Sequence, residues 1–100
     1  MPDLKAALET SKAFGFMSEE EVRTLYDLAC VFANTERPMF VNVGAGVGTS
    51  GLALRAGCPS ATIYTVDYSP GSPLGGLQNE KNKFSEYGME LPHPILGPVS

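Results

Sequence analysis

The fold is decided by one stretch of the chain, Met39-Phe40-Val41-Asn42-Val43 followed directly by Gly44-Ala45-Gly46-Val47-Gly48-Thr49-Ser50-Gly51. The first five residues form a short β-prone run, which predicts a strand buried on both faces. Gly44 then allows a sharp turn, and Gly46 leaves backbone free to lie against a ligand. We expect Gly48 to let the following helix pack closely on the strand.

Downstream of this stretch, strand and helix patterns alternate. Residues 52–56 are predicted to be helical as far as Gly57, and residues 62–66 form a second strand that ends on Asp67. Ser72, followed by a proline, is expected to cap a further helix that ends at Gly88. The apolar stripe of that helix would consist of Leu74, Leu77, Phe84 and Tyr87. Ile95 and Leu96 can begin a third strand.

Two helices are predicted upstream, over residues 3–13 and 18–33. The second has a capping box, in which the Ser18 hydroxyl accepts from the amide of Glu21 and the Glu21 carboxylate returns to the amide of Ser18. Its apolar stripe would consist of Val22, Leu25, Leu28, Ala29 and Phe32. Cys30 lies within this stripe, so we expect it to be a buried small hydrophobe.

The element order predicts an α/β fold, a Rossmann-like parallel sheet with flanking helices and right-handed crossovers. A doubly wound sheet usually has about five to seven strands, whereas two or three are predicted here, so the fold is expected to be incomplete. We expect residues 1–37 to form an N-terminal helical arm and residues 38–100 to form the truncated β-α-β half of the Rossmann-like domain.

Composition is that of a single globular domain, with 43% hydrophobic and 18% charged residues. The net charge of −4 without a basic run argues against a nucleic-acid or anionic-membrane surface. The sequence has no secretory signal and no membrane-spanning stretch, which predicts a cytoplasmic protein with free Cys30 and Cys58 thiols. A disulfide between the two cysteines is the alternative. No metal site is predicted, because histidine and cysteine do not cluster at metal-ligand spacing.

The glycine loop and Asp67 together predict a nucleotide site. Asp67 comes about 20 residues after the loop, at the tip of the neighbouring strand, where it can accept from ribose hydroxyls. A phosphate-binding P-loop is excluded, because Leu52 follows Gly51 where a lysine is required. A dinucleotide motif fits residues 46–51 by letter, but counted from Gly44 its third glycine falls at Thr49. The alternative is purely structural: the glycines serve a tight turn and Asp67 is a solvated loop residue.

The loop and the second strand, residues 40–50 and 63–67, resemble the first two motifs of class I S-adenosylmethionine-dependent methyltransferases. The helix over residues 18–33 is also similar to the one that precedes the first strand in small-molecule members of that family. The resemblance implies that S-adenosylmethionine is the cofactor. It implies that Gly44, Gly46 and Gly48 contact its methionine and ribose portions, that Asp67 holds the ribose diol, and that Tyr68 lies beside the adenine.

Three polar residues complete the site that the resemblance implies. The Thr49 and Ser50 hydroxyls can reach the methionine carboxylate, although both also suit the N-cap of the following helix. Asn42 stands where many family members have an acid, and it can accept from the methionine ammonium without bringing a charge. The third strand would end near Gly97 and Pro98, which leaves the adenine side unassigned.

Three functions follow as hypotheses. The first is the cofactor-binding portion of a methyltransferase that acts on a small molecule, with its catalytic residues unassigned. The second is a non-catalytic Rossmann-like scaffold or partner-binding module, and the third is a fragment of an NAD-dependent oxidoreductase. The uncovered edge of so short a sheet predicts self-association or a partner chain. His93, between two prolines, is interpreted as part of a stiff loop and not as a base, and Tyr26, Tyr64 and Tyr87 as packing residues.

Overall fold

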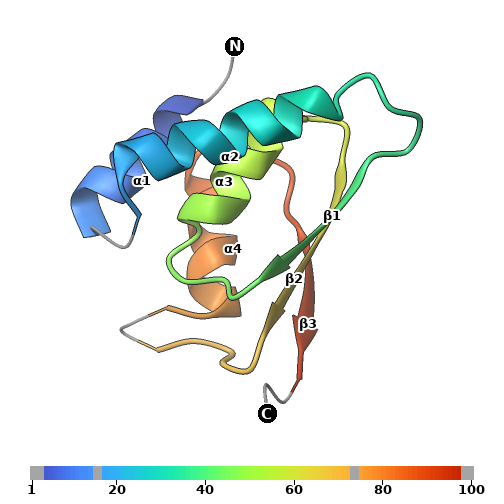
Figure 1. The fold of residues 1–100 in the computed structure, drawn as a ribbon. Helices are drawn as coiled ribbons and strands as arrows, with labels where there is room; N and C mark the ends of the chain where they lie inside the picture. Colours follow the sequence, from blue (N-terminus) through green and yellow to red (C-terminus); the bar gives the residue numbers. More distant parts are fainter. Residues whose placement is uncertain (1–3, 15–16, 73–74, 98–100) are drawn as a thin grey trace.

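The computed structural model describes residues 4–14, 17–72 and 75–97. Three parallel strands form one sheet in the order β1-β2-β3, and helices cover one side of it (Figure 1). The elements are α1 (Leu4–Phe14), α2 (Glu19–Val31), β1 (Met39–Val43), α3 (Thr49–Gly57), β2 (Thr62–Asp67), α4 (Leu77–Glu86) and β3 (His93–Leu96). The predicted Rossmann-like α/β architecture with an incomplete parallel sheet is confirmed.

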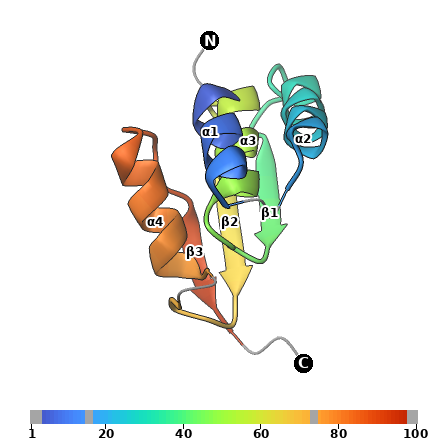
Figure 2. The same cartoon turned by 90° about the vertical axis from the view of Figure 1, so that its left-hand side faces the viewer.

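The core lies between the sheet and the helices. One buried cluster joins all four helices, and Figure 2 shows α1 and α2 stacked around α3, with α4 beside β3. Its buried members are Ala6, Ala7, Val22, Leu52, Ala53 and Phe84. A second cluster lies between α2, α3 and β2, and it consists of Ala29, Cys58, Ala61 and Ile63. Both clusters hold α3, so the helix that follows the glycine loop is fixed from several sides.

The open face of the sheet corrects the expectation that β1 is buried on both faces. Alternate residues of β1 are exposed, with Val41 at 62% and Val43 at 73%, while Phe40 and Asn42 on the other face are half-buried. The cause is that a β-strand points successive side chains to opposite faces, and the described helices cover only one of them.

Helix α2 begins as the sequence predicts but buries a narrower stripe. The Glu21 amide donates to Ser18 Oγ at 3.1 Å and the Ser18 amide donates to Glu21 Oε1 at 2.9 Å, which confirms the capping box. Leu28, at 54% exposed, Phe32, at 47%, and Cys30 are exposed, so their predicted burial is wrong. Both cysteines are free, and the buried one is Cys58.

Helix α3 crosses α2 at backbone contact. A β-carbon on Gly57 would lie 2.5 Å from the Tyr26 carbonyl oxygen and 2.7 Å from Ala29 Cβ, so only glycine fits there. The buried Arg55 secures the same end of α3, because its guanidinium donates to the carbonyls of Pro59, Ala61 and Glu90. Charge-assisted bonds of this kind stabilise the entry into β2 and the segment before β3.

The end of the chain departs from the sequence prediction at two places. Helix α4 begins at Leu77 with Gly76 at its N-cap, so Ser72 is not the cap; the predicted stripe residue Leu74 lies outside the described residues. His93 is the first residue of β3 and not part of a loop, and its ring centroid lies 5.2 Å from that of Tyr64 on β2. The prolines on either side of His93 do not prevent parallel pairing with β2, because β3 is an edge strand among the described residues.

Within the described ranges, none of the helices is both long and apolar enough to cross a membrane.

Candidate functional site

The glycine loop lies at the carboxyl end of β1, beside the end of β2. Gly44, Gly46 and Gly48 have φ values of +91°, +55° and +102°, which L side chains rarely adopt. A β-carbon on either of the first two would meet no atom within 4 Å, so backbone conformation and not crowding requires glycine there. The Gly44 amide donates to the Val66 carbonyl at 2.7 Å and ties the loop to β2.

Gly48 has a different role from the one expected. It is the N-cap of α3, and a β-carbon on it would lie 3.3 Å from Lys83 Cβ and 3.4 Å from Glu80 Cα. Close packing at this glycine is therefore against α4 and not against the strand. Thr49 and Ser50 follow the cap as the first helical residues, so the N-cap interpretation of their hydroxyls is wrong.

Asp67 is buried at 7% exposed, which excludes the interpretation as a solvated loop residue. Its Oδ2 accepts from the Ala45 amide at 2.7 Å, and its Oδ1 accepts from the Ser69 amide at 2.9 Å. The carboxylate thus joins the glycine loop to the segment after β2. A carboxylate oxygen has two lone pairs, so each oxygen can accept one further hydrogen bond.

Two polar side chains at the loop have buried atoms without partners. Thr49 is 5% exposed, and its hydroxyl has no hydrogen bond within the part of the chain that the structure describes. Asn42 accepts from the Ser50 hydroxyl at 3.2 Å through Oδ1, and its Nδ2 faces the Glu80 carboxyl without a close hydrogen bond among these residues. Leaving such a group unpaired costs about 1–3 kcal/mol. The Thr49 hydroxyl lies at the N-terminal end of α3, where helix amides favour an anion.

Hollows lie on both sides of Gly46. One, of about 170 Å³, is lined by Gly46, Asp67, Tyr68, Ser69, Ser72, Gly75 and Gly76. The other, of about 80 Å³, is lined by Met17, Gly44, Ala45, Gly46, Val47, Thr49 and Ser50. Tyr68 is 71% exposed beside the first hollow, which leaves its ring free to lie against a ligand. The structure therefore brings five of the seven candidate residues to these hollows, while Asn42 and Gly48 line neither of them.

Two glycines that the sequence analysis did not assign to the site lie against the loop. The Gly76 amide donates to the Gly46 carbonyl at 2.9 Å, and a β-carbon on Gly75 would lie 2.7 Å from the same oxygen. Their φ values of +132° and +139° require glycine. Two adjacent glycines before a helix were the sequence signal for an unusual backbone at this point. The sequence does not show which segment these glycines approach.

Glu80 is a third residue near the site that the sequence did not reveal. It is 2% exposed on α4, and its Oε2 accepts from the Thr65 hydroxyl at 3.1 Å. Burial raises the pKa of this carboxyl to about 7; Asp67 adds to the rise, and the Thr65 hydroxyl and the Asn42 amide oppose it. Its spacing after Leu77 and before Phe84 puts it on the apolar stripe of α4, which was the sequence signal for burial.

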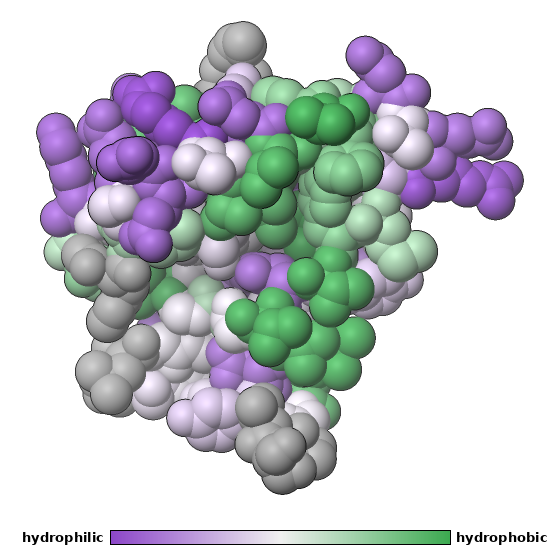
Figure 3. All heavy atoms as spheres, in the orientation of Figure 1, coloured by the Kyte–Doolittle hydropathy of each residue, from purple (hydrophilic) through white to green (hydrophobic). Residues whose placement is uncertain are grey.

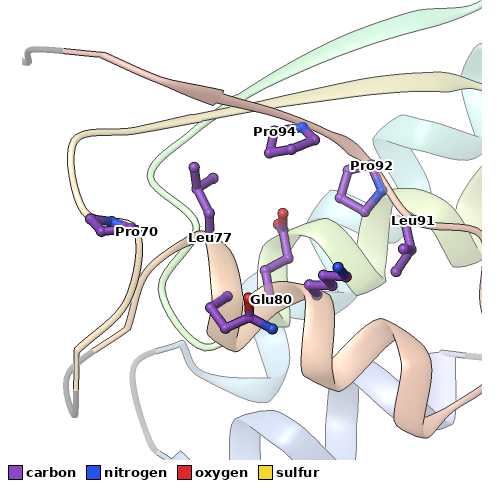
Figure 4. A pocket seen from close by; sticks show the side chains of 8 residues that line it. Pro70, Leu77, Glu80, Leu91, Pro92 and Pro94 are labelled. Atoms are coloured by element: carbon purple, nitrogen blue, oxygen red, sulfur yellow. The ribbon is translucent and has the colours of Figure 1, made fainter.

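The Glu80 side chain also lines a groove between α4 and β3. Figure 4 shows it extending between Leu77 and Leu91 toward Pro94. The groove has a volume of about 380 Å³, and its lining is Pro70, Leu77, Gln78, Glu80, Lys81, Leu91, Pro92 and Pro94. Glu80 thus lies at the wall of this groove although the residue is almost fully buried.

No family model matches the sequence, and a comparison with curated proteins finds no match. Solved structures do match. One is the methyltransferase PaMTH1 from Podospora anserina bound to S-adenosylhomocysteine, with a TM-score of 0.72 and 22% identity over 98% of this chain and 43% of that chain. Another is the O-methyltransferase TomG from Streptomyces achromogenes, involved in tomaymycin synthesis and bound to S-adenosylmethionine. Its TM-score is 0.70 and its identity 17%, over 98% of this chain and 44% of that chain.

The likeness establishes the fold. The chain has the same Rossmann-like fold as the corresponding part of these two methyltransferases, and it spans less than half the length of either.

Proposed function

We propose that this chain is the cofactor-binding portion of an S-adenosylmethionine-dependent methyltransferase and binds that cofactor at the glycine loop. The observation that carries the proposal is the buried Thr49 hydroxyl, which has no hydrogen-bond partner among the described residues and lies at the N-terminus of α3. A methionine carboxylate is an anion of the size and charge that this helix terminus favours. The cofactors bound in the two similar structures support the same assignment.

Each candidate residue has a role in this proposal. Thr49 donates to the methionine carboxylate, and Asn42 lies behind the loop near the ammonium. Gly44, Gly46 and Gly48 give the loop the left-handed backbone that brings its amides to the ligand.

The remaining two candidates lie after β2. Asp67 accepts from the ribose hydroxyls with the lone pairs that Ala45 and Ser69 leave free, and Tyr68 lies along the adenine. Asp67 is already fixed by two backbone amides before the ligand arrives, so little ordering is required of it on binding.

When bound, the cofactor supplies a methyl group on a sulfonium, and the protein contributes positioning and exclusion of water. We propose a small-molecule methyl acceptor, in line with the role of TomG in tomaymycin synthesis. We assign no catalytic residue within the described ranges. The two free thiols support a cytoplasmic location.

Thermal unfolding with and without ligand tests the proposal. S-adenosylhomocysteine at about 100 times its Kd should stabilise the chain by about 2.7 kcal/mol, a rise of several degrees in Tm, whereas NAD should not. Thr49→Val removes the hydroxyl at nearly constant volume, so it should leave the ligand-free Tm unchanged or higher and reduce the ligand-induced rise. Thr24→Val, at an exposed position on α2, is the matched control.

Other outcomes would redirect the assignment. A rise with NAD alone would favour the oxidoreductase hypothesis. A cooperative transition that neither ligand shifts would contradict the methyltransferase proposal and favour the partner-binding module.

The open face of the sheet favours the partner-binding module as a second candidate function. We propose that the partner is a second copy of the chain. The exposed hydrophobic residues on this face are Met39, Val41, Val43 and Ile95. Within the described residues, no strand pairs with the outer edge of β1. Figure 3 shows hydrophobic side chains gathered over the strands and along α2. Unpaired strand edges beside an apolar face favour association of identical chains.

Sedimentation equilibrium tests this association. The wild-type chain is expected to sediment as a dimer at micromolar concentration. Val41→Lys should shift it to the monomer, because a charge at the centre of the open face is costly to bury. Ala13→Lys, at an exposed position on α1, should leave the dimer unchanged. A wild-type chain that is monomeric throughout would contradict the proposal.

A further inference from the structure

Two buried carboxyl groups lie at the candidate site or directly behind it, and neither has a basic partner among the described residues. Asp67 is 7% exposed and Glu80 is 2% exposed, and the structure gives neither an ion pair within the residues that it describes. The buried Arg55 directs its guanidinium to backbone carbonyls and to Glu90, at the opposite end of α3. Uncompensated negative charge inside a protein is costly, and a cationic ligand relieves that cost.

Glu80 lies directly behind the first turn of α3. A β-carbon on Gly51 would lie 2.7 Å from Glu80 Oε2, and a β-carbon on Gly48 would lie 3.4 Å from Glu80 Cα. The hydroxyl that it accepts from belongs to Thr65, two residues before Asp67 on β2. The carboxyl group is therefore held against the elements that carry the glycine loop and the ribose-binding acid.

We propose that Glu80 makes this site select the positively charged sulfonium of S-adenosylmethionine over the neutral thioether of S-adenosylhomocysteine. The inference rests on the proposed function. In the transfer an electron pair of the acceptor forms the new bond to the methyl carbon, the C–S bonding pair stays on sulfur, and one positive charge passes from the ligand to the methylated acceptor. A buried negative charge behind the loop attracts the substrate form more strongly than the product form, so it favours release of the product.

The charge on Glu80 changes in the neutral pH range, which makes the selection measurable. Burial raises the pKa of its carboxyl to about 7, so the group goes from neutral to charged as pH rises through that value. The charged group that faces it from β2 is Asp67, while β1 presents the uncharged Asn42 amide, α3 presents Gly51 and β3 presents Pro94. On α4 itself, Lys81 is exposed at the rim of the groove and the Lys83 ammonium pairs with Glu86 at 3.0 Å.

Isothermal titration calorimetry at pH 5.5, 6.5, 7.5 and 8.5 tests the proposal with the wild-type chain alone. The ratio of the Kd of S-adenosylhomocysteine to that of S-adenosylmethionine should rise about fivefold across this range, because only S-adenosylmethionine carries the sulfonium that ionised Glu80 attracts. The two ligands share their ammonium, carboxylate and adenine groups, so titration of those groups cancels in the ratio. Near pH 7, S-adenosylmethionine should also release more protons on binding than S-adenosylhomocysteine does.

Two variants complete the test. Glu80→Gln keeps an acceptor for Thr65 without the charge, and its ratio should not vary with pH. Glu86→Gln, on the exposed side of the same helix, should keep the wild-type profile. A pH-independent ratio in the wild type, or an unchanged profile in Glu80→Gln, would overturn the inference and leave the proposed function standing. Binding of neither ligand would overturn both.

Discussion

Replacing Asp67 by asparagine is expected to weaken S-adenosylhomocysteine binding on the order of 100-fold. The carboxylate is proposed to accept two charge-assisted hydrogen bonds from the ribose, and such bonds contribute about 1.5–3 kcal/mol each. An amide cannot accept at both positions, because its nitrogen only donates. Calorimetric Kd values for the wild type and the variant measure this loss directly.

The substitution also affects the ligand-free chain. Asp67 accepts from the amides of both Ala45 and Ser69, so asparagine leaves one of these donors facing another donor. This should lower the free energy of unfolding by about 1–3 kcal/mol, and binding must therefore be measured where the variant remains folded by circular dichroism. Asp27→Asn, on the exposed side of α2, should change neither property. A folded Asp67→Asn chain that binds within threefold of the wild type would refute the ribose assignment.

The elements around the glycine loop could be predicted closely from local sequence alone. Strand β1 begins and ends where the apolar run does, since Gly44 stops it, and β2 ends on Asp67 as expected. The capping box at Ser18 is likewise a local signal, because both of its hydrogen bonds join residues three apart. Such features depend on neighbours in sequence and not on the rest of the fold.

Burial could not be predicted in the same way. The same residues of β1 fit a strand covered on both faces or on one, and only the position of the helices decides that Val41 is exposed. Cys30 lies within an apolar stretch, yet α2 contacts α3 through the neighbouring Ala29 and turns the cysteine to solvent. Composition gives the amount of apolar surface, whereas packing decides which part of it is covered.

The residues of the candidate site likewise differ in how far local sequence predicts them. Gly44, Gly46 and Asp67 follow from their order along the chain, because the carboxyl ends of parallel strands meet at one edge of the sheet. Gly75, Gly76 and Glu80 reach the site from α4 and the segment before it. Their contacts with Gly46 and Gly51 depend on how α4 packs across the sheet, which no short motif encodes.

Between pH 5 and pH 8 the wild-type chain is expected to lose on the order of 3 kcal/mol of stability through Glu80 alone. The pKa of this carboxyl rises from its ordinary value of 4.5 to about 7 in the folded chain, chiefly because of burial. Between these two values the folded chain holds a proton that the unfolded chain has released. Stability therefore falls as pH rises through this window, and it stays low above pH 7 because the folded chain must then bury a charge.

Urea unfolding at pH 5, 6, 7 and 8 gives the free energy of unfolding of the wild type and of Glu80→Gln. The difference between the slopes of these two free energies against pH measures the contribution of Glu80. The free energy of unfolding of the variant should lack the decline, because glutamine has no proton to release. Glu86→Gln should follow the wild type, since its side chain is exposed beside Lys83. Parallel curves for the wild type and Glu80→Gln would mean that the carboxyl does not hold its proton in this window. A decline in the free energy of unfolding of the wild type alone would mean that the ionised Glu80 carboxylate destabilises the ligand-free chain at neutral pH. A bound cation can offset this cost.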